Sequence, residues 1–329
     1  MAQQRQKAIG EFKERIEQDT TMNSEEKTRA LGQFLKEGFA AKSSTSVIES
    51  NTHVTELKES NKVLTDKEIL DKIKLNHLKP EEKVKALELF KKYISVFARH
   101  EYDCPPNNLG VEADIQLTED FNPNKTVNCK YFPIPPQIRP QVRNILKKMQ
   151  ENGIITDCTE YSPMVSNLLI GKKKSINGII KARVLVDCRL VNFFSRRMPT
   201  MLTNTQEIFA NFSKKTHISS CDINNAFFTI PIKPKKSALF TFFDENKQRK
   251  KFLRQPQGGK NSSAFMEILT GKLLEPLKNT CAYVDDLYVS TSGTGSIGFQ
   301  THLDEMENLL KRLQHANLKL KAEKLHFHQ

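Results

Sequence analysis

The chain has 329 residues, enough for two ordinary domains or for one domain of roughly 200 residues with a long appendage. Lys and Arg outnumber Asp and Glu by 51 to 38, and the resulting net charge of +13 attracts polyanions such as nucleic acid. The six cysteines form no CxxC pair, no stretch approaches the roughly 20 apolar residues of a membrane span, and the polar start lacks the apolar core of a signal peptide. This composition argues against a zinc module, a disulfide framework and a membrane protein, and it indicates a reduced intracellular compartment, cytoplasmic or nuclear.

The first third of the chain is predicted to be helical and charged. Apolar residues at helical spacing predict two amphipathic helices in a helical extension over residues 1–42, and the Ser- and Thr-rich residues 43–64 are predicted to be a linker. A helical lead-in is predicted over residues 65–104, and Thr65 and Glu68 have the spacing of a capping box at its start. Nothing in this third indicates chemistry.

From residue 105 onward, short β-prone runs alternate with helices without a strict βαβ rhythm, which is typical of an α+β domain. One helix is predicted to stop at Gly153, and two more are predicted over residues 267–277 and 302–318. Strands are predicted over residues 166–170, 182–186, 217–223, 238–243 and 282–289.

The sharpest local feature is the sequence CAYVDDLYVS at residues 281–290, where two β-prone triplets flank a pair of aspartates. It predicts a tight hairpin that carries Asp285 and Asp286 at its tip. Because aspartate is a common turn former, the alternative is a solvated hairpin end without function.

A third carboxylate, Asp222, lies at the end of a predicted strand well before the hairpin. Mg²⁺ is usually held by one or two carboxylates together with substrate phosphates. Two such ions about 4 Å apart can drive phosphoryl transfer, so we expect the carboxylates of Asp222, Asp285 and Asp286 to lie within roughly 6 Å of one another. The alternative is that Asp222 only caps the turn that follows it.

These residues and four further motifs resemble the reverse transcriptases of retroviruses and of Gypsy-type long-terminal-repeat retrotransposons. The sequence YVDD at residues 283–286 matches the YxDD box of that family, and DINNAFFTIPI, which begins at Asp222, matches its palm strand. The further motifs resemble the start of the fingers, the RxxVDxRxLN segment, the PQG segment and the end of the palm, in the family's order, at residues 146–163, 183–192, 256–264 and 320–327. An ordered series of motifs is far more specific than one motif.

The resemblance implies an α+β fold: the fingers and palm of a reverse transcriptase over residues 105–329, with an antiparallel palm sheet packed on helices, preceded by the helical N-terminal segment. The implied activity is that of an RNA-directed DNA polymerase in a retroelement Pol polyprotein, with two Mg²⁺ ions, or Mn²⁺, as cofactors. The expected partners are an RNA or DNA template with its primer and deoxynucleoside triphosphates, and no membrane. The chain stops at Gln329, before the thumb, connection and ribonuclease H domains that follow in the family, so we expect these Pol domains to be missing.

The resemblance also implies roles for individual residues. Around the metal ions it places three carboxylates and one backbone carbonyl, with a lysine as proton donor to pyrophosphate: Asp222, Asp285, Asp286, Ile223 and Lys324. Around the incoming nucleotide it places Lys173, Arg183, Asn225, Ala226, Phe227, Gln257 and Gly258, and at the primer end Tyr283 and Val284. Lys and Arg suit the triphosphate, and the ring of Phe227 would exclude a ribose 2′-hydroxyl.

Each of these roles has a plainer alternative. The lysines at 172–174 could form a solvated loop, Phe227 could be an ordinary core aromatic, and Lys324 is one of several lysines near a helix end. The chain also departs from the family at Gly259, where an aromatic residue or leucine is usual. Two rival hypotheses follow: an inactive relic that folds and binds nucleic acid without catalysis, and a basic helical adaptor with an accidental YxDD.

Overall fold

The computed structural model describes residues 63–125, 127–128, 131–174, 180–200, 212–213 and 215–328. The chain divides into two compact units, Met1–Ser60 and Asn61–Gln329, and all described residues belong to the second. The helices predicted over 1–42, and the predicted linker up to residue 62, therefore lie outside the described residues.

The described chain begins with the helical lead-in. Helix α3 (Asp66–Lys72) starts at the predicted capping box, in which Thr65 and Glu68 each accept a hydrogen bond from the backbone N–H of the other. Helix α4 (Pro80–Lys92) has a proline in its first turn, where no backbone donor is needed. A 3₁₀ turn, η1 (Ile94–Val96), follows, and the remainder of the lead-in is irregular.

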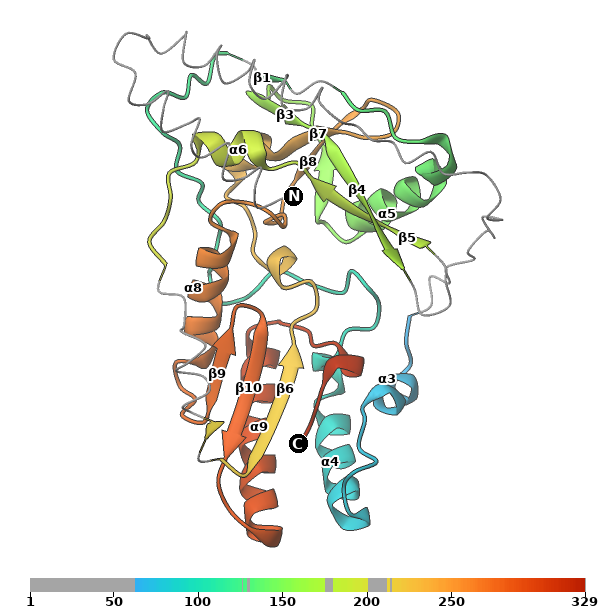
Figure 1. Cartoon of the computed structure of the whole chain (residues 1–329), viewed down its shortest axis with the longest axis vertical. Coiled ribbons are helices and arrows are strands. Elements are labelled where there is room, and N and C mark those ends of the chain that lie inside the picture. Colours follow the sequence, from blue (N-terminus) through green and yellow to red (C-terminus); the bar gives the residue numbers. More distant parts are fainter. Residues whose placement is uncertain are drawn as a thin grey trace. The chain divides into compact units, whose positions relative to one another are not determined.

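A three-stranded antiparallel sheet carries the predicted hairpin. Its strands are β6 (His217–Asp222), β10 (Asp286–Thr291) and β9 (Thr280–Tyr283), with β10 in the middle. Figure 1 shows the three strands side by side with the long helix α9 (Gly295–His315) behind them, and α9 packs on both β10 and β6. The antiparallel sheet packed on helices is thereby confirmed. Helix α8 (Ser262–Leu274) contacts both α9 and β9.

A second sheet is assembled from short strands that come from distant parts of the sequence. Its order is β1-β3-β7-β8-β2, with parallel pairing of β3 to both β1 and β7 and antiparallel pairing elsewhere. The strands are β1 (Val127–Asn128), β2 (Ile155–Asp157), β3 (Met164–Ser166), β7 (Thr241–Phe243) and β8 (Arg249–Phe252). Beside it lie a separate hairpin and two helices, namely β4 (Leu168–Lys174), β5 (Ile180–Val186), α5 (Arg139–Glu151) and α6 (Arg189–Phe194).

Two strand predictions in this region differ from the structure. The strand predicted over 166–170 is interrupted at Asn167, which separates β3 from β4. Residues 238–240, predicted as the start of a strand, belong to a 3₁₀ helix, η4 (Pro234–Phe240), and only Thr241–Phe243 are extended. Pro234 fixes a helical φ at the start of η4, and the hydroxyl of Ser237 donates to the carbonyl of Pro234 at 2.9 Å. These local interactions outweigh the β-propensity of the Ala-Leu-Phe run.

The lead-in shares its core with the end of the palm motif. The ring of Phe90 packs edge to face against the rings of Phe97 and Phe327, and all three are fully buried. Leu320 donates its N–H to Val96 and accepts a hydrogen bond from the N–H of Ala98. The lead-in is therefore part of the same folded body as the three-stranded sheet. No helix of the described chain is both long and apolar enough to cross a membrane.

Candidate active site

The predicted carboxylate hairpin is present. Asp286, the first residue of β10, lies directly opposite Asp222, the last residue of β6, and opposite Tyr283 of β9. Opposed residues of antiparallel strands have Cα atoms about 4.5–5.5 Å apart, so the two carboxyl groups start from adjacent backbone positions. Asp285 and Val284 form the two-residue turn, and the carbonyl of Asp285 accepts a hydrogen bond from the N–H of Ile223 at 3.4 Å.

Val284 holds the turn in a left-handed conformation, with a φ of 57°. That conformation is costly for a β-branched residue, and a two-residue hairpin requires a positive φ at its first turn position. Such strain persists only where the surrounding structure over-determines it and is concentrated at functional sites. The half-exposed Tyr283 stands just before this turn, so both predicted primer-end residues lie at the tip of the hairpin.

Two lysines hold the carboxylate of Asp222. Lys321 Nζ lies 2.7 Å from Asp222 Oδ2, and Lys324 Nζ lies 2.8 Å from Oδ1, so each oxygen accepts from a different ammonium group. Asp222 is only 7% exposed, and these cations neutralise a charge that would otherwise be buried alone. Sequence reasoning assigned Lys324 and missed Lys321. The three-residue spacing of Lys321 and Lys324 could have indicated Lys321, because it places both lysines on one side of the short 3₁₀ turn η5 (Ala322–Lys324).

The other two carboxylates carry unbalanced negative charge. Burial raises the pKa of Asp285, and the nearby charge of Asp222 raises it further. The pKa of Asp286 is raised for the same two reasons, in the same order. The hydrogen bond to Asp222 raises the pKa of Lys324. The cluster would be stabilised by additional positive charge.

A divalent cation fits the chemistry of this donor set. Carboxylate oxygens are the ligands that Mg²⁺ prefers, and one or two of them suffice when phosphates complete the shell. Among the described residues, no three His, Cys, Asp or Glu side chains are arranged to hold a metal ion together. Both carboxylate oxygens of Asp222 accept hydrogen bonds from lysines. The charge of Asp222 raises the pKa values of Asp285 and Asp286.

Two of the predicted nucleotide-binding residues meet directly. The guanidinium of Arg183, on β5, donates to the side-chain oxygen of Gln257. The thiol of Cys188 lies 3.7 Å from the backbone carbonyl of Gln257, and the amide of Asn192 donates to the carbonyl of Gly258 at 2.8 Å. The segment from β5 through α6 thus positions the PQG loop. Lys173 lies on β4 opposite Lys181.

The turn after Asp222 is fixed by the lead-in. Asn225 has a left-handed backbone, with φ 45° and ψ 49°, and its side-chain amide donates to the carbonyl of Glu101. The amide of the buried Asn224 donates to the carbonyls of Glu101 and Asp103 at 3.1 and 2.9 Å. The side chain of Asn225 is therefore engaged by the protein. Sequence reasoning missed this support, because backbone carbonyls of an irregular segment leave no sequence signal.

Ala226 and Phe227 begin the 3₁₀ helix η3 (Ala226–Thr229), directly after this turn. Ala226 is buried, and Phe227 is partly buried and packs against the hydrophobic core. Phe227 therefore has both a packed side and a solvent-facing side.

The packing of the PQG loop explains why residue 259 is a glycine, where the family usually has an aromatic residue or leucine. A Cβ at Gly259 would lie 2.5 Å from Gln255 Nε2 and 2.8 Å from Ser262 Oγ, and both of those side chains are buried. The side chain of Gln255 occupies the space and donates to Ser262 Oγ at 2.7 Å. Gly258 has a φ of 92°, a conformation that glycine adopts without strain.

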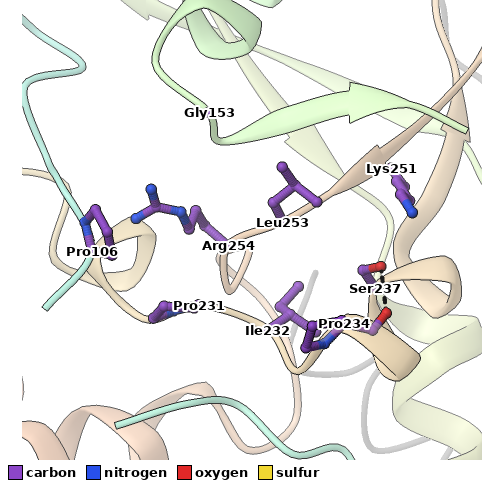
Figure 2. Close-up of a pocket in the computed structure, with 9 residues that line it drawn as sticks. All are labelled: Pro106, Gly153, Pro231, Ile232, Pro234, Ser237, Lys251, Leu253 and Arg254. Carbon is purple, nitrogen blue, oxygen red and sulfur yellow. Dashed lines mark hydrogen bonds between the residues drawn. The ribbon is translucent and has the colours of Figure 1, made fainter. Parts of the chain in front are cut away.

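None of the predicted site residues lines a separate hollow of about 340 Å³. Its lining is Pro106, Gly153, Pro231, Ile232, Pro234, Ser237, Lys251, Leu253 and Arg254. Figure 2 shows Arg254 between Pro106 and Leu253. Its guanidinium donates to the carbonyl of Phe228 at 3.2 Å, and burial lowers its pKa. Arg254 therefore stabilises η3 by this hydrogen bond and is not itself one of the candidate site residues.

Comparisons with known proteins identify the family of this chain. A family model described as "Reverse transcriptase (RNA-dependent DNA polymerase)" matches residues 146–329. The chain is 27% identical over 258 residues to the retrovirus-related Pol polyprotein from transposon 297 of Drosophila melanogaster, covering 77% of this chain and 23% of that protein. It is 27% identical over 190 residues to the Pro-Pol polyprotein of Simian foamy virus type 1, covering 57% of this chain and 15% of that protein. The chain thus spans less than a quarter of the length of these relatives.

Solved structures with the same fold come from a foamy virus. The prototype foamy virus protease-reverse transcriptase superposes with a TM-score of 0.66 at 23% identity, covering 80% of this chain and 33% of that one. A foamy viral protease-reverse transcriptase in complex with an RNA/DNA hybrid also gives 0.66, at 21% identity, covering 80% and 33%. The three-stranded sheet corresponds to the palm and the second sheet with its hairpin to the fingers. The family match spans more than half of the sequence, and the chain belongs to the reverse transcriptase (RNA-dependent DNA polymerase) family.

Proposed function

We propose that this chain is the fingers and palm of an RNA-directed DNA polymerase that adds deoxynucleotides to a primer 3′-hydroxyl. One observation carries the proposal: Asp222 and Asp286 are paired across adjacent antiparallel strands, with Asp285 in the turn beside them. The Pol polyproteins from Drosophila transposons 297 and opus support a Gypsy-type element as the source. The complexes of foamy viral enzymes with double-stranded DNA and an RNA/DNA hybrid support a primer-template as partner.

The three aspartates, with the backbone carbonyl of Ile223, would hold two Mg²⁺ ions, which would activate the primer hydroxyl and stabilise the charge on the leaving pyrophosphate. Lys324 lies beside Asp222, where it would protonate the leaving pyrophosphate as a general acid. The strained turn would present Tyr283 and Val284 to the primer end.

The fingers would bind the nucleotide. Arg183, oriented by Gln257, would contact the triphosphate, and Lys173 on the neighbouring strand would add a second cation. The backbone N–H groups of Asn225 and Ala226 would meet phosphate oxygens, and Gly258 would allow close approach to the base and sugar. Phe227 would exclude a ribose 2′-hydroxyl by its volume.

Primer extension tests the proposal. The chain, supplied with the thumb that follows the palm in the family, is mixed with an RNA template, a DNA primer, deoxynucleotides and Mg²⁺. We expect extension that disappears with EDTA and with Asp285→Asn, because the substitution removes a charge from the cluster while preserving its shape. Binding of the primer-template without extension in the unsubstituted protein would instead indicate the inactive relic.

A further inference from the structure

The two lysines at Asp222 differ in how the backbone holds them. The N–H of Lys321 donates to the backbone carbonyl of Asp222 at 3.1 Å, and the neighbouring residues Leu320 and Ile223 form an antiparallel bridge. Lys321 is thus tied by its main chain to the same residue whose carboxylate its side chain contacts. Its side chain is 28% exposed, against 54% for that of Lys324.

An ammonium group and a divalent cation compete for one carboxylate oxygen. Lys321 Nζ lies 2.7 Å from Asp222 Oδ2, while Mg²⁺ would sit about 2.1 Å from a ligand oxygen. Both cations on one oxygen would lie less than about 5 Å apart, where a dication and a monocation repel each other strongly in a buried site. A metal ion that takes Oδ2 must therefore displace the ammonium of Lys321.

Displacement needs little rearrangement at Lys321. Its backbone stays bonded to Asp222, and rotation about its side-chain bonds moves the ammonium toward solvent. Without metal, the same ammonium neutralises the buried carboxylate of Asp222, so Asp222 is not left as an unpaired buried charge.

We propose that Lys321 is a positioning residue that competes with the divalent cation for Asp222: it holds Oδ2 when metal is absent, leaves when metal binds, and so sets the metal concentration at which the site fills. The inference rests on the proposed function, because it takes Asp222 as a metal ligand. It assigns to Lys321 a task distinct from the proton donation proposed for Lys324.

Metal binding can be measured without catalysis. Mn²⁺ is titrated into the full chain and the free ion is followed by its electron paramagnetic resonance signal. Lys321→Asn, which removes the competing charge, is expected to bind Mn²⁺ about tenfold more tightly than the unsubstituted chain. Lys321→Arg, which can hold the carboxylate with two parallel hydrogen bonds, is expected to bind it several-fold more weakly.

The matched control is Lys319→Asn. Lys319 lies two residues away, and its ammonium donates to the carbonyl of Ser95 instead of to a carboxylate. It carries the same charge, so its loss reports any general effect of net charge on Mn²⁺ binding. We expect an affinity within about twofold of the unsubstituted chain.

Thermal melting supplies a second measurement. In EDTA, Lys321→Asn should melt at a lower temperature because Asp222 loses a partner, and added Mg²⁺ should raise its melting temperature more than that of the unsubstituted chain. An equal deficit with and without Mg²⁺, together with unchanged Mn²⁺ affinity in both Lys321 variants, would show a purely structural lysine and overturn the proposal.

Asp222→Asn separates the two levels of the argument. If it leaves Mn²⁺ binding unchanged, Asp222 is not a ligand and the proposed function itself fails at this residue. If it abolishes binding while the Lys321 variants bind like the unsubstituted chain, the catalytic proposal stands and only the role of Lys321 is wrong.

Discussion

The palm and the fingers of this chain are built in opposite ways. The palm sheet takes two of its three strands from one hairpin, β9 and β10, and its register places Asp222 and Asp286 at opposed backbone positions. The fingers sheet joins five strands of two to four residues each, drawn from between residues 127 and 252. The candidate catalytic aspartates Asp285 and Asp286 thus lie on a hairpin whose fold is specified by nearby residues. The surface that would bind the nucleotide instead depends on packing between distant parts of the sequence.

A substitution at the palm carboxylates should therefore remove activity and leave the fold. For Asp222→Asn we expect the rate of primer extension to fall about ten-thousandfold, or about 5.4 kcal/mol in the barrier, because a metal ligand and a buried charge are both lost. Extension rates and a melting curve, recorded on the same protein, test this. Loss of activity caused only by unfolding of the variant would contradict this expectation.

A substitution in the fingers core should do the reverse. Phe252, on β8, is buried and packs against the rings of Phe242 and Phe228 at centroid distances of 5.3 and 6.3 Å. Phe252→Ala should lower the free energy of unfolding by about 3–5 kcal/mol through the cavity it leaves. Denaturant titration measures the loss, and Mn²⁺ affinity of the fraction that remains folded should not change.

The PQG loop connects strand β8 of the fingers sheet to helix α8. A substitution at Gly259 tests how tightly this loop is packed. Gly259→Ala should cost about 1–3 kcal/mol in stability, because its new methyl group meets the side chains of Gln255 and Ser262. Shortening the first neighbour, in Gly259→Ala combined with Gln255→Ala, should recover part of that loss. If the single substitution is neutral by denaturant titration, the loop is looser than the structure indicates.

The smallest effect is expected at Phe227, whose substitution distinguishes a role in nucleotide selection from a role in core packing. If its ring is the steric barrier, Phe227→Val should raise the efficiency of ribonucleotides over deoxynucleotides about tenfold, or about 1.4 kcal/mol of discrimination. If it only packs in the core, the variant should lose stability with the ratio unchanged. Single-nucleotide extension with both sugars, read beside a melting curve, distinguishes the two.

Local signals made much of the palm predictable. The capping box at Thr65, the strand ending at Asp222 and the hairpin around Asp285 each depend on residues within a few positions of one another. The strands of the fingers sheet are short, and β2 and β8 are extended because they pair with each other, which no local pattern shows. For the same reason the sequence did not reveal the carbonyls that hold Asn224.

The contact between the lead-in and the end of the palm motif constrains how the chain folds as it is made. The hydrogen bond from Lys319 to Ser95 spans 224 positions. At about 5–20 residues per second, the ribosome would need roughly 10 to 45 seconds to produce the second partner after the first. During that interval Phe90 and Phe97 lack the ring of Phe327 that completes their cluster. The nascent lead-in therefore exposes an aromatic surface that a chaperone, or another nascent chain, can bind before the palm closes.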